Sequence, residues 1–200
     1  MASVAARPGA WTAGALLLAA AAAAEPGPAA APGPKITESR HYYRVDATGL
    51  ESLRAQLFEN ATAAGLAPGT IGRTRQAVEV RYLLDPLPDR CRLSALAIHL
   101  DLAIDLPEWQ PSGTTRPELR ARWAQMISAL TRHEEGHRDN AIWAAKELHE
   151  RLSQLGEGAD CDALGKLAQR EMFRVKLRFN LREQAYDRRT GHGVSQGTVL

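Results

Sequence analysis

The chain has no long run of basic residues and no apolar run long enough to span a bilayer, and it has only two cysteines. Its net charge is only +2 at pH 7 and acidic residues are interleaved with its arginines, so a nucleic-acid partner is not expected. Hydrophobic residues make up 44% and charged residues 24%, which is ordinary for a soluble globular protein. Its 200 residues suffice for one domain with a substantial core.

The longest apolar run lies near the N-terminus, from Trp11 to Ala24. At about 14 residues it is shorter than the roughly 20 that a bilayer-spanning helix needs, and it ends in small residues that suit a cleavage site. We therefore predict a signal peptide over residues 1–24, with an uncleaved anchor or an alanine-rich tail as alternatives. A flexible Pro/Gly/Ala linker is expected over residues 25–37. The protein is then secreted or periplasmic, without stable membrane insertion after cleavage.

Cys91 and Cys161 are the two cysteines. In an exported protein a small even number of cysteines most simply forms one disulfide, whereas two unrelated buried thiols are the alternative. We predict a bridge that closes a loop of about 70 residues and stabilises the fold by constraining the unfolded chain.

Alternating patterns in the first half of the chain predict strands. The clearest runs from Leu96 to Leu106, where every second residue is leucine or isoleucine, so one face of the strand packs on a core. Pro107 is expected to end it. Weaker signals predict strands over residues 41–47 and 75–84, a turn over 85–89 and a short helix over 49–61.

Helical spacing of apolar residues predicts two long helices in the second half. The first runs over residues 117–155, after a capping box that starts at Thr115, and the second covers about residues 160–184. This order predicts an α+β fold: a small antiparallel or mixed sheet with an early helix, followed by two long helices. We place the folded domain at residues 38–193 and a C-terminal tail at 194–200.

The first long helix contains the segment His133-Glu134-Glu135-Gly136-His137, a HExxH motif. Histidines four residues apart share a helix face, about 6 Å apart along its axis, so both imidazoles can reach one Zn²⁺ ion. Glu134 is then placed to take a proton from zinc-bound water as general base, while Glu135 points elsewhere and is solvated. The segment thus predicts a hydrolytic zinc site.

The helix face that carries both histidines is apolar: it also contains Leu130, Ala141, Ala144 and Leu148. This face should therefore point to the core, where a histidine pair needs partners such as a metal. Gly136 costs about 1 kcal/mol in a helix interior, which suggests that another group packs close to it. The alternative is a second capping box, Thr131 with Glu134, which starts a helix and involves no metal.

The third metal ligand must come from another segment, and "YDRRTGHG" at residues 186–193 offers candidates. We expect His192, because the glycines on both sides let the backbone approach closely, with Asp187 as second choice and Glu171 as third. An exposed C-terminal histidine is the alternative. Tyr186 is expected to stabilise the oxyanion of the reaction, or else to be a packed tyrosine with its hydroxyl in water.

Two further expectations concern the surroundings of the motif. The strand from Leu96 to Leu106 is a candidate edge along which a peptide substrate adds as an extra strand, although a central strand fits its pattern equally well. Asp139 and Asn140 are candidates to support the histidines, but we expect both to be exposed.

Several of these segments occur in an order that resembles a bacterial family of unknown function described as predicted secreted zinc-dependent proteases. They are "HYYRVDATGLESLRAQL", "CRLSALAIHLDLAIDLPEW", "HEEGH", the later Cys161 and "YDRRTGHG", within about residues 40–193. The resemblance implies that His133, Glu134 and His137 form the active-site set and that residues 186–193 belong to the site. It also supports export and the pairing of Cys91 with Cys161, and it supplies no substrate.

The sequence therefore predicts an exported zinc metallohydrolase, most simply an endopeptidase of zincin-like α+β fold that acts on a protein or peptide. His133, His137 and His192 are expected to bind Zn²⁺. Glu134 is the expected general base. The alternative is a non-catalytic envelope protein that uses a zincin-like scaffold to bind a metal or a partner.

Overall fold

The computed structural model describes residues 33–200, so the predicted signal peptide and linker residues 25–32 lie outside the described residues. The strands are β1 (Lys35–Val45), β2 (Arg73–Leu87), β3 (Arg90–Trp109) and β4 (Glu157–Gly158). The helices are α1 (Leu50–Ala63), α2 (Pro117–Ser153), α3 (Cys161–Thr190) and the 3-10 helix η1 (Val194–Gln196). Because β1 begins at Lys35, the last residues of the predicted linker belong to the sheet.

The strands form one mixed sheet in the order β1-β3-β2, which confirms the predicted α+β fold with a small mixed sheet. β2 and β3 form a long antiparallel hairpin, β1 runs parallel to the second half of β3, and β4 pairs with its first residues. Every second residue of β3 is buried, as its pattern predicted: Leu96, Ile98, Leu100, Leu102, Ile104 and Leu106. β3 is thus central and not the free edge considered for a substrate.

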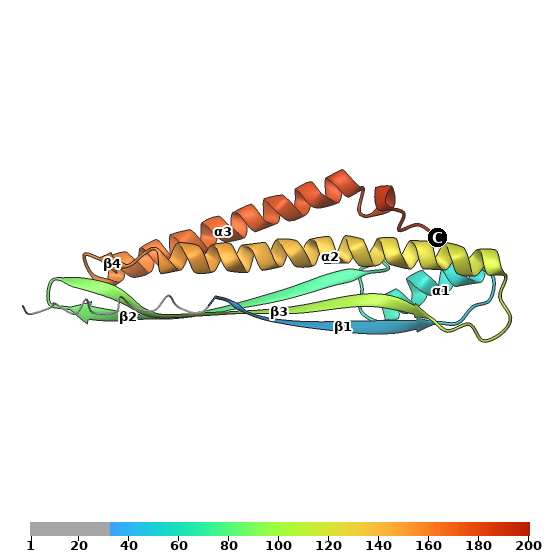
Figure 1. Ribbon diagram of the computed structural model, residues 1–200, viewed down its shortest axis with the longest axis horizontal. Coiled ribbons are helices and arrows are strands. Elements are labelled where there is room, and N and C mark those ends of the chain that lie inside the picture. The colour runs from blue at the N-terminus through green and yellow to red at the C-terminus, as the bar shows by residue number, and fades with distance from the viewer. Residues whose placement is uncertain (1–32) are drawn as a thin grey trace, which may run out of the picture. The chain divides into compact units, whose positions relative to one another are not determined.

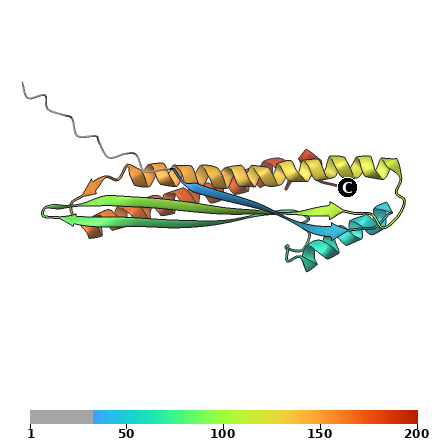
Figure 2. The same ribbon diagram turned by 60° about the horizontal axis from the view of Figure 1, so that its bottom comes forward.

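The long helices α2 and α3 lie on the same face of the sheet (Figure 1 and Figure 2). They run antiparallel, and α3 leans away from the sheet toward its C-terminal end (Figure 1). One apolar cluster joins α1, β1 and the first half of α2, and a second joins the β2–β3 hairpin to α2 and α3. Within residues 33–200, no helix has both the length and the hydropathy needed to cross a membrane.

α3 is longer than predicted, and this difference matters most for the site. The apolar pattern fades near Gln184, but the helix continues to Thr190 and ends at Gly191, whose φ of 56° is the left-handed conformation that glycine adopts easily. The last turns of α3 face α2 with polar side chains, which hydrophobic periodicity does not detect. Tyr186 and Asp187 therefore lie on a helix and not on the loop that the sequence suggested.

Other boundaries also differ from the prediction. β2 continues to Leu87 through the expected turn, and β3 continues past Pro107. Proline is tolerated there because β2 begins at Arg73, opposite Asp105, so the part of β3 after Asp105 is bonded to a strand on one side only. The predicted capping box is wrong: Arg116, not Thr115, occupies the N-cap of α2, and its side chain makes no capping hydrogen bond.

The predicted C-terminal tail packs on the domain. After η1, the chain returns toward α1, where the Leu200 side chain is buried and Arg54 donates two hydrogen bonds to the Leu200 carbonyl oxygen, at 2.9 and 2.7 Å. This segment consequently forms one wall of the site described below.

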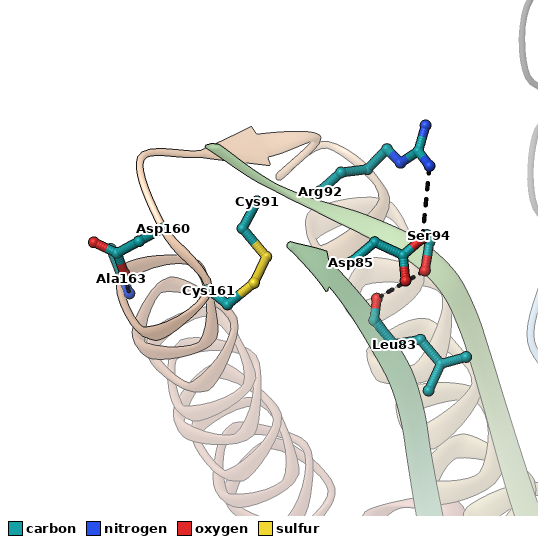
Figure 3. The surroundings of a disulfide bond; sticks show 8 residues. All are labelled: Leu83, Asp85, Cys91, Arg92, Ser94, Asp160, Cys161 and Ala163. Atoms are coloured by element: carbon teal, nitrogen blue, oxygen red, sulfur yellow. Dashed lines mark hydrogen bonds and ion pairs between the residues drawn. A yellow bond between two sulfur atoms is a disulfide. The ribbon is translucent and has the colours of Figure 1, made fainter. Parts of the chain in front are cut away.

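The predicted disulfide between Cys91 and Cys161 is confirmed (Figure 3). It joins the start of β3 to the first residue of α3 and spans 70 residues of sequence. Asp160 caps the same helix end by accepting a hydrogen bond from the Ala163 amide at 2.7 Å. The bridge thus fixes the N-terminal end of α3 against the sheet, opposite to the end that carries Asp187.

Replacing Cys91 and Cys161 together with alanine is expected to lower the free energy of unfolding by about 2–4 kcal/mol, because the unfolded chain loses the constraint of a long loop. Urea denaturation measures this. A reducing agent should destabilise the wild type to the level of the double variant and leave that variant unaffected. An unchanged stability in both experiments would contradict a structural role of the bridge.

Candidate metal centre

Two histidines of α2 present their rings to the same point. His133 and His137 are about one turn apart, and their Nε2 atoms lie 3.3 Å from each other. His133 is 5% exposed, and the neighbours Leu130, Ala141, Ala144 and Leu148 are also buried. The predicted core-facing stripe is therefore confirmed. α2 runs without interruption through Thr131, so the alternative helix start at that residue is wrong.

Asp187 of α3 completes a group of three side chains that offer atoms to one metal ion. Its Oδ1 lies 3.1 Å from His137 Nε2 and 3.7 Å from His133 Nε2. His192, the expected third ligand, lies beside this group with its side chain 80% exposed and its Nδ1 3.7 Å from Asp187 Oδ2. Glu171 lies about four turns earlier along α3, too far to join. The structure thus places Asp187, the second choice from the sequence, and not His192 in the group with the two histidines.

The other nitrogen of each histidine has a hydrogen-bond acceptor. His133 Nδ1 lies 2.9 Å from Gln196 Oε1, and His137 Nδ1 lies 2.9 Å from Glu183 Oε2. Both partners can accept a hydrogen bond, so a neutral imidazole that donates from Nδ1 to its partner presents its lone pair at Nε2. Asn140 donates to Glu183 Oε1 at 2.7 Å and is buried, so the prediction that Asn140 is exposed was wrong.

Burial and neighbouring charges act differently on the two imidazoles. Burial lowers the pKa of His133 and outweighs its hydrogen bond with Gln196. Burial also opposes the charged form of His137, but the hydrogen bond and charge of Glu183, together with the charge of Asp187, outweigh it and raise the pKa of His137. The pair therefore accepts a first positive charge more readily than a second.

Glu134 lies on the side of α2 that faces β2. The residue is 4% exposed, and the Thr74 hydroxyl of β2 lies 2.9 Å from both its Oε2 and its carbonyl oxygen. Burial raises the pKa of the Glu134 carboxyl, although the Thr74 hydrogen bond acts in the opposite direction. A raised pKa makes a carboxylate a better proton acceptor. Glu135 was expected to be solvated but pairs with Arg40 of β1 at 2.7 Å.

Tyr186 fills the space beside Gly136. A Cβ atom at position 136 would lie 2.1 Å from the Tyr186 hydroxyl oxygen, which confirms the prediction that another group packs close to this glycine. The ring stacks on His133 with centroids 5.3 Å apart, and the hydroxyl donates to the His133 carbonyl oxygen at 3.1 Å. Gln196 Nε2 lies 3.3 Å from the same hydroxyl. This arrangement makes Tyr186 a positioning residue behind His133 and places its hydroxyl away from the cavity described next.

The three-residue group opens into a cavity of about 560 Å³. Its lining includes Gly72 just before β2, Thr74 and Gln76 of β2, and residues of α3 and of the C-terminal segment. Glu134 and His192 also line it, as do the apolar side chains of Leu57, Phe58, Leu130 and Val199. A molecule in this cavity can therefore contact the histidines, Glu134 and the edge of the sheet at once.

Sequence patterns missed three residues of the centre. Glu183 had a usable signal, because it precedes Asp187 by four residues and shares its helix face, but only if the helix is known to continue that far. Thr74 reaches Glu134 through strand pairing, and Gln196 through the turn after α3. No local pattern marks either of them.

The model of a bacterial family of unknown function, DUF922, matches residues 40–193. No curated protein and no solved structure matches the chain.

Gly136→Ala is expected to lower the free energy of unfolding by about 1–3 kcal/mol, because the cost of overpacking against Tyr186 exceeds the gain of about 1 kcal/mol in helix propensity. Gly165→Ala in α3 is the matched control: its Cβ would meet Leu84 Cδ1 at an ordinary 3.6 Å, so this variant should be neutral or more stable. Urea denaturation of both decides. Equal effects would contradict a close contact at Gly136.

Proposed function

The chain belongs to the bacterial family DUF922, to which no activity is assigned. We propose that this protein is an exported zinc-dependent hydrolase, most simply an endopeptidase of zincin-like architecture. His133, His137 and Asp187 hold the zinc ion, and Glu134 is the general base. The proposal rests on how the side chains of α2 and α3 converge on one point.

The separations of the three ligand atoms suit zinc. A tetrahedral ion with bonds of about 2.0–2.1 Å to nitrogen and oxygen keeps its ligand atoms about 3.3 Å apart. The three separations in this group are 3.3, 3.1 and 3.7 Å. Two imidazoles and one carboxylate also form a ligand set of catalytic zinc sites, which keep a fourth position for water or substrate.

A single observation carries the proposal: the Nε2 atoms of two imidazoles and a carboxylate oxygen meet in a mostly buried place. These groups repel one another unless a positive charge lies between them. The acceptors Gln196 and Glu183 hold each Nδ1 outward, so the rings cannot relieve the repulsion by turning over. A divalent cation satisfies all three atoms at once, whereas a proton bridges two at most.

Zinc bound at these atoms would supply the Lewis acidity that activates water for attack on a carbonyl group. The protein contributes a proton acceptor and a cavity of defined shape. Glu134 lines that cavity, and Thr74 fixes its carboxylate from the side of β2. Its raised pKa favours accepting a proton from the water and giving it later to the leaving amine.

The edge of β2 supports a peptide as substrate. Among residues 33–200, β2 pairs with β3 alone, so its other edge is free where Gly72, Thr74 and Gln76 line the cavity. An extended peptide can add to such an edge through backbone hydrogen bonds, with its side chains in the apolar part of the cavity. The sequence suggested β3 as the strand to which a peptide substrate adds, and we now propose β2 instead.

The disulfide supports export as part of the proposal. Bridges such as Cys91–Cys161 persist in oxidising compartments and are rare in reducing ones. A secreted or periplasmic enzyme is consistent with this bridge.

Asp187→Asn is expected to weaken zinc binding by about 100-fold or more, because it removes a charged ligand. His192→Ala is the matched control and should leave the affinity within about threefold, since the His192 side chain is mostly exposed. Competition with a chromophoric chelator measures both. Loss of zinc in His192→Ala but not in Asp187→Asn would reverse the assignment of the third ligand.

Glu134→Gln is expected to retain one zinc ion and to lose at least about 100-fold in the rate of hydrolysis of unfolded casein, because the proton acceptor is gone while the ligands remain. Zinc content and cleavage are measured in the same preparation. Full activity in this variant would overturn the role of Glu134. Zinc binding by a wild type that cleaves nothing would instead favour a non-catalytic envelope protein that binds a metal or a partner.

A further inference from the structure

The face of α3 that points away from the core is both basic and apolar. Six exposed residues at helical spacing share it: Lys166, Arg170, Phe173, Leu177, Leu181 and Arg188. At 1.5 Å per residue they extend over about 33 Å of the helix. We call this surface the α3 stripe. The side of α3 that faces away from α2 and the sheet carries no other helix or strand of residues 33–200 (Figure 1).

The centre of the α3 stripe is an apolar ridge on successive turns of the helix. Phe173 is 67% exposed, Leu177 50% and Leu181 53%. The core-facing side of the same helix carries different apolar residues, among them the buried Leu164 and Val175. α3 therefore has two apolar faces, and only one of them is used within the domain. A contiguous exposed ridge of this kind marks an interaction surface.

Positive charge surrounds this ridge. Lys166 pairs with Asp162, which lies one turn earlier, and the exposed Arg174 at the margin pairs with Glu171. In the part of the chain that the structure describes, no ion pair engages Arg170, Lys176 or Arg188.

A shallow depression lies at the N-terminal end of the ridge. Its lining comprises Lys166, Gln169, Arg170, Phe173 and Arg174. Two ion-paired cations, an amide and Arg170, which no ion pair engages within residues 33–200, thus line an open hollow next to an exposed aromatic ring. This chemistry suits a phosphate group whose attached hydrocarbon continues over the ridge.

We propose that the α3 stripe binds the surface of an anionic phospholipid bilayer. Phe173, Leu177 and Leu181 enter the interface between headgroups and acyl chains, while the flanking lysines and arginines meet lipid phosphates. Charge favours this occupant over a second copy of the chain, because two α3 stripes face to face would bring arginines against arginines. The proposal goes beyond the hydrolase and does not depend on zinc.

Vesicle flotation of the full-length protein tests the proposal. The vesicles contain phosphatidylcholine alone or with 30% phosphatidylglycerol, about the charge of an anionic membrane. We expect binding to the anionic vesicles that weakens with added salt. The triple variant Phe173→Gln, Leu177→Gln, Leu181→Gln should bind at least about tenfold more weakly, and glutamine keeps the helix propensity. Every variant shares the N-terminus, so any contribution of residues 1–32 is the same in each comparison.

Leu83→Gln is the matched control, because Leu83 is 63% exposed on β2 and outside the α3 stripe. It should bind like the wild type. Arg170→Gln with Lys176→Gln should weaken binding and reduce its dependence on salt. A second measurement follows tryptophan fluorescence with brominated lipids: Leu177→Trp should gain a quenched signal, and Leu83→Trp should gain one that is not quenched.

Several results would overturn the proposal. The first is a wild type that binds neither kind of vesicle. The second is a triple variant that floats with anionic vesicles as well as the wild type does. The third is a Leu177→Trp variant whose added fluorescence is not quenched by brominated lipids. Sedimentation velocity covers the remaining occupant: self-association that the triple variant abolishes, without vesicle binding, would assign the α3 stripe to a second copy of the chain.

Discussion

Where α3 passes α2, the ring of Tyr186 occupies the volume that a side chain at Gly136 would fill. This contact fixes the rotation of α3 about its own axis, because the ring also stacks on His133 and its hydroxyl bonds the α2 backbone. Glu183 and Asp187 lie on the same side of α3 as Tyr186 and are thereby brought to the histidines. The alignment of ligands from two helices thus depends on one absent Cβ atom.

The polar groups of the centre form a nearly complete set of hydrogen bonds. Asn140 holds Glu183, Glu183 holds His137, and Gln196 holds His133. The atoms that these bonds do not use are the two Nε2 atoms and Asp187 Oδ1, and they face one another. A network that fixes these side chains and brings two imidazole nitrogens and a carboxylate oxygen together is well suited to receive a metal ion.

The sequence allowed the local features of the fold to be predicted, and not those that depend on long-range packing. The buried face of β3 and the apolar face of α2 around the histidines were predicted because the spacing of apolar residues repeats within one strand or helix. The end of α3 was not, because its last turns are polar. His192 was preferred over Asp187 for its flanking glycines, but Gly191 and His192 both adopt positive φ and turn the chain at the end of α3, where the imidazole is mostly exposed.

The central claim is that His133, His137 and Asp187 bind one zinc ion. X-ray absorption at the zinc edge of the wild type, after dialysis against metal-free buffer, tests it most directly. We expect one zinc per chain, with two imidazole nitrogens and oxygen ligands at about 2.0–2.1 Å. A protein that retains no zinc, or a spectrum with fewer than two imidazoles, would contradict it.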